Sequence, residues 1–90
     1  MTIALPALVM QAQAQSVADG LAAALCAQVA QGHEAVLDAS ALQQFDSSAL
    51  AVVLACRRAV LGLGGAFRVT GLPERAQALA KVYGVKALFD

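Results

Sequence analysis

The residues of this sequence best suited to chemistry are Asp46, Ser47 and Ser48, which follow an apolar stretch and open a helical pattern. An aspartate at such a position caps a helix, because its carboxylate accepts hydrogen bonds from unpaired N–H groups of the first turn. We expect Asp46 to be the N-cap and both serines to be the first helical residues. Their hydroxyls would lie beside free backbone donors and the positive end of the helix dipole. The corner therefore suits a phosphate or another anion, or it is simply a well-capped helix start.

No other set of residues supplies the groups that catalysis or metal binding needs. The single histidine, His33, follows Gly32 in a predicted turn and is expected to be solvated. One histidine and two cysteines, Cys26 and Cys56, do not make a zinc ligand set. The cysteines lie far apart in the sequence, each within a predicted helix. We therefore expect two small buried thiols and no disulfide.

Two further patterns have simpler explanations than catalysis. Asp38 and Asp46 are carboxylates that the fold could bring close together, but a strand end and a helix cap account for both. The glycines of the 62–65 segment follow a helix and precede a strand, which is the reverse of the order in phosphate-binding loops. We predict a protein that is not an enzyme, with no catalytic residues, no cofactor and no metal.

Composition indicates a small globular domain. The 90 residues predict one domain, 1–90, with a radius of gyration of about 12 Å. Hydrophobic residues make up 60% of the chain, and many are alanine, which favours closely packed helices. The 6 basic and 6 acidic residues balance to zero formal charge and form no basic run, so nucleic acid is not an expected partner. Near-zero charge also suits a protein that works in a complex.

No segment has the pattern of a membrane span or a secretory signal. The longest apolar run, Ala49 to Cys56, ends at Arg57 and Arg58, whereas a spanning helix needs about 20 apolar residues. The N-terminus lacks a basic segment followed by an apolar core and a cleavage site. We expect a cytoplasmic protein with no direct membrane insertion.

Hydrophobic periodicity predicts strands that alternate with helices. A strand is expected from Thr2 to Met10, at a sheet edge or bent, because Pro6 cannot donate to a ladder. Ser16 and Asp19 have the spacing of a capping box, and they open a helix that Gly32 ends.

The rest of the chain repeats this alternation. Strands are expected at Glu34–Ala39 and Ala66–Gly71, on either side of the helix from Ser47. The apolar face of that helix comprises Leu50, Val53, Leu54, Val60 and Leu61, widened by Ala49, Val52 and Cys56. Pro73 suits the first turn of the last helix, whose predicted buried stripe is Ala76, Leu79, Ala80 and Tyr83. Val85, Leu88 and Phe89 form an apolar tail, expected as an edge strand or turn. The order β-α-β-α-β-α predicts an α/β domain with a small, mostly parallel sheet covered by helices.

The other face of the helix from Ser47 has little reason to be buried in the protein's own core. It carries small residues at helical spacing together with one charge: Ser47, Ala51, Ala55, Arg58 and Gly62. Small side chains let a partner's backbone approach closely, and Arg58 offers a charged anchor. We predict that this face docks a partner, with Asp46, Ser48 and a loop of Gln43, Gln44 and Phe45 at its edge. A plain solvated helix face, with alanine as a helix former, is the alternative.

The central third of the chain resembles the core of STAS domains. The resemblance rests on Leu-Asp-Ala-Ser at 37–40 and on Phe-Asp-Ser-Ser-Ala-Leu at 45–50, and it extends to about Val85. In the family, Asp is followed by Ser or Thr, a small residue, Gly and Leu, and Ala49 here replaces the usual Gly. Gly-Leu-Pro at 71–73 and the 79–85 segment resemble the MlaB-like branch. Many members have a further strand or hairpin at the start, so the resemblance does not predict which strand forms the edge of the sheet.

The resemblance implies a non-enzymatic adaptor. MlaB-like proteins bind the ATPase subunit of an ABC transporter that, with its permease at the inner membrane, moves phospholipids between bacterial membranes. The chain would then lie in the cytoplasm, peripheral to the inner membrane through this partner. The alternative is an anti-sigma-factor antagonist, whose partner is a serine-kinase anti-sigma factor. In antagonists the hydroxyl residue after the aspartate is phosphorylated, and by motif that residue is Ser47.

Overall fold

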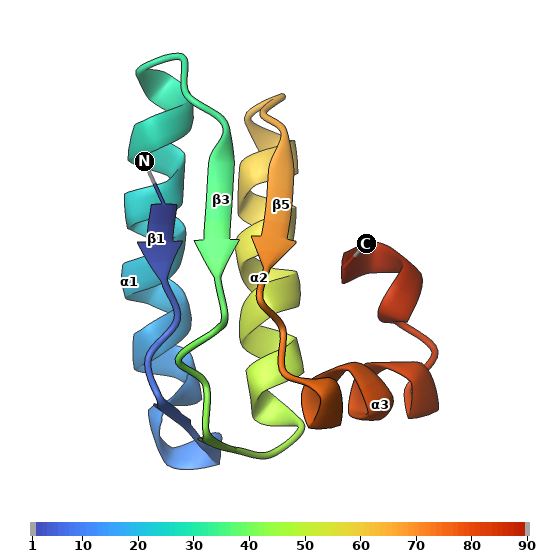
Figure 1. The fold of residues 1–90 in the computed structure, drawn as a ribbon. Helices are drawn as coiled ribbons and strands as arrows, with labels where there is room; N and C mark the ends of the chain where they lie inside the picture. Colours follow the sequence, from blue (N-terminus) through green and yellow to red (C-terminus); the bar gives the residue numbers. More distant parts are fainter. Residues whose placement is uncertain (1, 90) are drawn as a thin grey trace.

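In a computed structural model, which describes residues 2–89 apart from the side chain of Phe89, three parallel strands form a sheet with two long helices on one face (Figure 1). The strand order is β1 (Thr2–Ala4), β3 (Ala35–Asp38) and β5 (Phe67–Thr70). The covering helices are α1 (Gln11–Ala30) and α2 (Ser48–Gly62). The predicted α/β fold is confirmed, and the Cα radius of gyration is 12.0 Å. Within residues 2–89, no helix combines the length and hydropathy that crossing a membrane requires.

The central strand β3 carries the core of the sheet. Leu37 is fully buried and lies in register with Ile3 of β1 and Val69 of β5. All three belong to the apolar cluster beneath α1 and α2. Successive residues of a strand point to opposite faces, so Arg68 lies on the other face of the sheet, where it pairs with Glu34 at 3.4 Å. One apolar face and one polar face explain why the helices gather on one side.

The strand predicted at Thr2–Met10 is in fact two short strands. After β1 the chain bends at Pro6, as expected, because proline has no N–H for the ladder. It then forms β2 (Leu8–Val9), which pairs in parallel with β4 (Gln44–Phe45). The prediction of a single strand is therefore wrong, and the predicted loop at 43–45 is wrong for Gln44 and Phe45, whereas Gln43 lies outside the strand. Two-residue strands leave no periodic pattern for sequence reasoning to detect.

Helix α1 begins at Gln11, six positions before the start that a cap at Ser16 predicts. Its first N–H, that of Gln11, donates to the Asp46 carboxylate at 3.2 Å. Ser16 and Asp19 lie inside the helix, so the capping-box prediction is wrong. Locally, the side-chain oxygen of Gln13 accepts the N–H of Met10 at 3.2 Å, and Asp46 adds a bond from a distant part of the sequence that local spacing does not show. The predicted end is confirmed, since Gly32 follows the helix with a positive φ of 85°.

Two apolar residues are more exposed than their patterns predict. Leu61, in the last turn of α2, is 44% exposed, although helical spacing places it on the same side as the buried Leu50. Tyr83 follows α3 (Glu74–Val82) and is 59% exposed. Figure 1 shows α3 running sideways from the end of the sheet, so its last turn passes beyond the core. The chain then forms a 3₁₀ helix, η1 (Lys86–Phe89), in place of the expected edge strand or turn.

One polar side chain lies within the apolar core. Gln28 of α1 is only 6% exposed, and neither side-chain amide atom has a hydrogen-bond partner within residues 2–89. Leaving a buried polar group unpaired costs about 1–3 kcal/mol. We expect Gln28→Leu to raise the free energy of unfolding by about 1 kcal/mol in urea titrations, because leucine removes this cost at similar volume. Gln11→Leu, at an exposed position of α1, is the control, and a lower midpoint for Gln28→Leu would contradict the expectation.

Candidate partner-binding surface

The Asp46 carboxylate joins the starts of the two long helices. Its Oδ1 accepts the N–H of Ser48 at 2.8 Å, and its Oδ2 accepts the N–H of Gln11 at 3.2 Å. These residues are the first of α2 and of α1. One carboxylate therefore serves the positive ends of two helix dipoles. The Ser48 N–H is the main reason that the pKa of Asp46 lies below its ordinary value; the Ser48 hydroxyl and the Gln11 N–H also lower it, and partial desolvation opposes them.

This bridge predicts a pH dependence of stability. A carboxyl whose pKa is lower in the folded state contributes stability above its unfolded pKa, and that stability is lost as the pH falls through the folded pKa. We expect Asp46→Asn to destabilise the protein at neutral pH. Below about pH 4, the free energy of unfolding of this variant should fall less steeply with acidification than that of the wild type. An amide has only one acceptor oxygen and cannot serve both helices.

The measurement is the urea midpoint of unfolding between neutral and acidic pH. Asp19→Asn, which removes the same charge from the exposed surface of α1, is the control. If the urea midpoint of Asp46→Asn fell with acidification as much as that of the wild type, Asp46 would not stabilise the two helix starts as an ionised carboxylate.

Helix α2 begins one residue later than predicted, so the N-cap position falls on Ser47 and not on Asp46. Ser47 is the N-cap residue of α2, with helical backbone angles of −60° and −17°, and Ser48 is the first helical residue. The side chain of Ser47 makes no capping hydrogen bond within the described chain and is exposed. Asp46 supplies the cap from outside the helix, which leaves the Ser47 hydroxyl accessible to a partner.

Phe45 is tied to the chain's own third helix. Its half-buried ring lies under the Arg75 guanidinium of α3, 4.6 Å from the ring centroid. A cation above an aromatic face is attracted by the ring quadrupole. This contact connects β4, which leads into Ser47, with α3. Phe45 thus lies at the edge of the predicted surface, and the Arg75 side chain covers one face of its ring.

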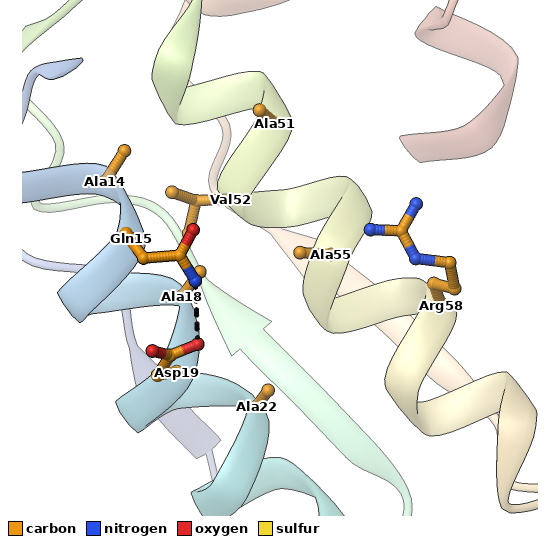
Figure 2. A pocket seen from close by; sticks show the side chains of 9 residues that line it. All are labelled: Ala14, Gln15, Ala18, Asp19, Ala22, Ala51, Val52, Ala55 and Arg58. Atoms are coloured by element: carbon orange, nitrogen blue, oxygen red, sulfur yellow. Dashed lines mark hydrogen bonds between the residues drawn. The ribbon is translucent and has the colours of Figure 1, made fainter.

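The small residues of α2 form one wall of a groove. Ala51, Ala55 and Arg58 line a hollow of about 440 Å³ between α2 and α1. Figure 2 shows the alanines of the two helices facing each other across it. The α1 wall is made of Ala14, Gln15, Ala18, Asp19 and Ala22. The predicted α2 face is therefore one side of a two-helix surface.

A second hollow lies on the other side of α2. It measures about 310 Å³, and mostly apolar side chains of α2 and of the C-terminal segment line it: Ser47, Leu50, Ala51, Leu54, Tyr83 and Val85. Ala51 is exposed and lines both hollows. Ala51 thus lies on a ridge of α2 between the two hollows, with Ser47 lining the second hollow and Ala55 and Arg58 lining the first.

Comparison with known families identifies the fold. The sequence profile of the family described as "Mlab, STAS domain" matches residues 7–90, which is nearly the whole chain. The chain belongs to the STAS domain family. No curated protein and no solved structure is significantly similar to it. Domains of this family are generally not enzymes, and membership supports a small adaptor or antagonist-like protein.

Several side chains of this STAS domain that sequence analysis singled out as possible reactive groups are buried or held by local hydrogen bonds. Burial raises the pKa of the Cys56 thiol to about 11, with the nearby Cys26 adding to the shift. Such a thiol is a poor nucleophile. His33 is exposed, as predicted. Asp38 accepts the N–H of Ser40 at 2.9 Å, and this bond, followed by that of the Ser40 hydroxyl, lowers its pKa. Within residues 2–89, no cluster of three or more His, Cys, Asp or Glu side chains could hold a metal.

Sequence reasoning missed the α1 half of this surface. The signal was present as alanine at every fourth position, Ala14, Ala18 and Ala22. A helix that opens at Ser16 leaves Ala14 outside the helical pattern, which hides the repeat. Alanine is also the strongest helix former, so its spacing does not by itself distinguish a contact surface from a plain helix. In the structure these alanines line the hollow beside α2, and their role in binding is a prediction.

Proposed function

We propose that this STAS domain is a non-enzymatic adaptor that binds the ATPase subunit of an ABC transporter moving phospholipids between bacterial membranes. It would act in the cytoplasm, at the inner membrane through this partner and the permease. The observation that supports the proposal is that the α2 residues Ser47, Ala51, Ala55 and Arg58 line two neighbouring hollows in a chain of the "Mlab, STAS domain" family. Small side chains beside concave, partly apolar surfaces suit close packing by a protein partner.

Purification from the host tests this proposal. The tagged full-length chain is captured in mild detergent, and its partners are identified by mass spectrometry. We expect an ATPase subunit, recognised by its phosphate-binding motif, together with a membrane-spanning permease. Recovery of a serine kinase, with a phosphate on Ser47, would overturn the proposal in favour of the signalling antagonist.

A charge at Ser47 should weaken the complex. The hydroxyl lies at the edge of the mostly apolar hollow, next to the Asp46 carboxylate. We expect Ser47→Asp to lower the affinity for the captured ATPase subunit about tenfold, because a like charge and an unpaired carboxylate enter the interface. Ser47→Ala is the matched control and should bind like the wild type. Equal affinity of Ser47→Asp and the wild type, measured by titration calorimetry, would count against an interface at Ser47 and equally against a phosphorylation switch.

A further inference from the structure

Helix α3 has one face that the rest of the described chain does not cover. Its two buried residues, Ala76 and Ala80, lie on the side toward the core. On the opposite side, at helical spacing, lie Glu74, Ala78 and Lys81, all of them exposed. Figure 1 shows α3 running sideways beyond the end of the sheet, so this side of the helix is accessible to another molecule.

The same side of α3 ends in exposed apolar groups. Val82, one turn after Ala78, is 81% exposed, and the adjoining Tyr83 is 59% exposed. They are the two most exposed large apolar side chains among those that the structure describes. Exposed apolar groups that lie together commonly mark a contact with another molecule. We refer to Glu74, Ala78, Lys81 and Val82 as the outer face of α3.

The charges of the outer face have no partner inside the chain. Neither the Glu74 carboxylate nor the Lys81 ammonium has an ion-pair or hydrogen-bond partner within residues 2–89. The neighbouring Gln77, by contrast, donates to the carbonyl of Leu72 at 2.8 Å. Glu74 and Lys81 are seven residues apart, which is two helical turns, so they lie about 10 Å apart along one side of α3.

The order of these charges makes the outer face complementary to itself. If two copies of α3 lie antiparallel about a two-fold axis near Ala78, each Glu74 faces the Lys81 of the second copy, and two ion pairs form. A parallel arrangement would instead place like charges together. The small side chain of Ala78 at the centre permits a close approach of the two helices, and each Val82 then lies against the first turn of the opposite helix. A symmetric dimer uses the same patch on both copies in this way.

We propose that two copies of this chain associate through antiparallel pairing of α3, with Glu74 of each copy bound to Lys81 of the other. The inference is independent of the proposed function, because no residue of the outer face lines either hollow. The formal net charge of zero also produces no general repulsion between copies. A helix of 9 residues is about 14 Å long, which places the contact at the small end of the size range of specific interfaces. The dimer is therefore expected to be weak and to form at high protein concentration.

Sedimentation equilibrium of the full chain, from micromolar to millimolar concentration, tests the dimer. We expect the wild type to dimerise as the concentration rises. Glu74→Lys alone and Lys81→Glu alone should each weaken dimerisation at least about tenfold, because each variant places two pairs of like charges together. Asp19→Lys makes the same change of charge as Glu74→Lys at an exposed position of α1 and should leave dimerisation unchanged. Circular dichroism checks that each variant is folded.

An equal mixture of the two single variants provides the decisive measurement. One variant then carries lysine at both positions and the other carries glutamate at both, so opposite charges meet at both contacts of a mixed dimer. We expect the mixture to recover the association of the wild type, a result that weakened folding of either variant would not produce.

Three results would overturn the inference: a wild type that stays monomeric at millimolar concentration, single variants that dimerise as the wild type does, or a mixture that stays monomeric. A monomeric wild type whose α3 is protected from hydrogen exchange only in complex with another captured protein would assign the outer face to that protein instead.

Discussion

Ala51→Arg should abolish capture of the ATPase subunit, with a loss of affinity of at least about 100-fold, or roughly 2.7 kcal/mol of binding free energy. Ala51 is exposed and lines both hollows, so it is the residue that the two concave surfaces share. An arginine there would place a long charged side chain between the two surfaces and block close approach from either side. Truncation or obstruction at the centre of an interface commonly costs 2 kcal/mol or more.

The fold should survive this change. The side chain of Ala51 points out of the core, and arginine is a good helix former. The control is Ala27→Arg, which makes the same substitution at an exposed position of α1 outside both hollows. Co-purification and calorimetry measure the effect, and circular dichroism checks the fold. If Ala51→Arg keeps its partner with a native spectrum, the ridge on α2 is not the interface.

Gly71→Ala should destabilise the protein by about 3 kcal/mol, from two additive causes. Gly71 follows β5 with a φ of +67°, a conformation that costs a residue with a Cβ about 1–2 kcal/mol. A Cβ at this position would also lie 2.9 Å from the Cβ of Ser40 and 3.2 Å from the Asp38 carboxylate. These atoms belong to or lie near the backbone of the turn after β3 and cannot swing aside, so a further penalty of about 1–3 kcal/mol follows.

Gly64→Ala separates the two causes. Gly64 has a similar φ of +76°, but a Cβ there would meet nothing within 4 Å. We expect Gly64→Ala to lower the free energy of unfolding only by the cost of the positive φ, about 1–2 kcal/mol. Urea unfolding of the two variants measures the difference, which reports the close approach of Gly71 to the Asp38–Ser40 turn. Equal losses would show that the turn moves aside freely. Because α3 begins soon after Gly71, a displaced turn should also shift α3 and the second hollow, which Tyr83 lines, and so weaken partner binding there.

Much of the fold could be predicted because its signals are local. The buried strand 35–38, the alternation at 67–70 and the glycines that end the helices all follow from side-chain periodicity and backbone freedom. The central motif around Asp46 was enough to indicate the STAS family, which the match over residues 7–90 confirms. The face of α2 with Ala51, Ala55 and Arg58 was found from helical spacing alone, and its role in binding remains a prediction.

The remaining features depend on contacts between distant residues. The start of α1 is capped by Asp46, 35 positions away, and no pattern near Gln11 reports that bond. Tyr83 and Leu61 have the spacing of buried residues, but the core ends before it reaches them. The groove arises only when Ala14, Ala18 and Ala22 meet Ala51 and Ala55 across the helix pair.

Local patterns thus predicted the three helices, the strands β3 and β5, the family and one wall of the candidate site, because each depends on neighbours along the chain. The tertiary structure decided where α1 begins, which apolar residues stay exposed, and that the site has a second wall. These depend on which helix lies beside which, and short-range periodicity contains no information about that packing.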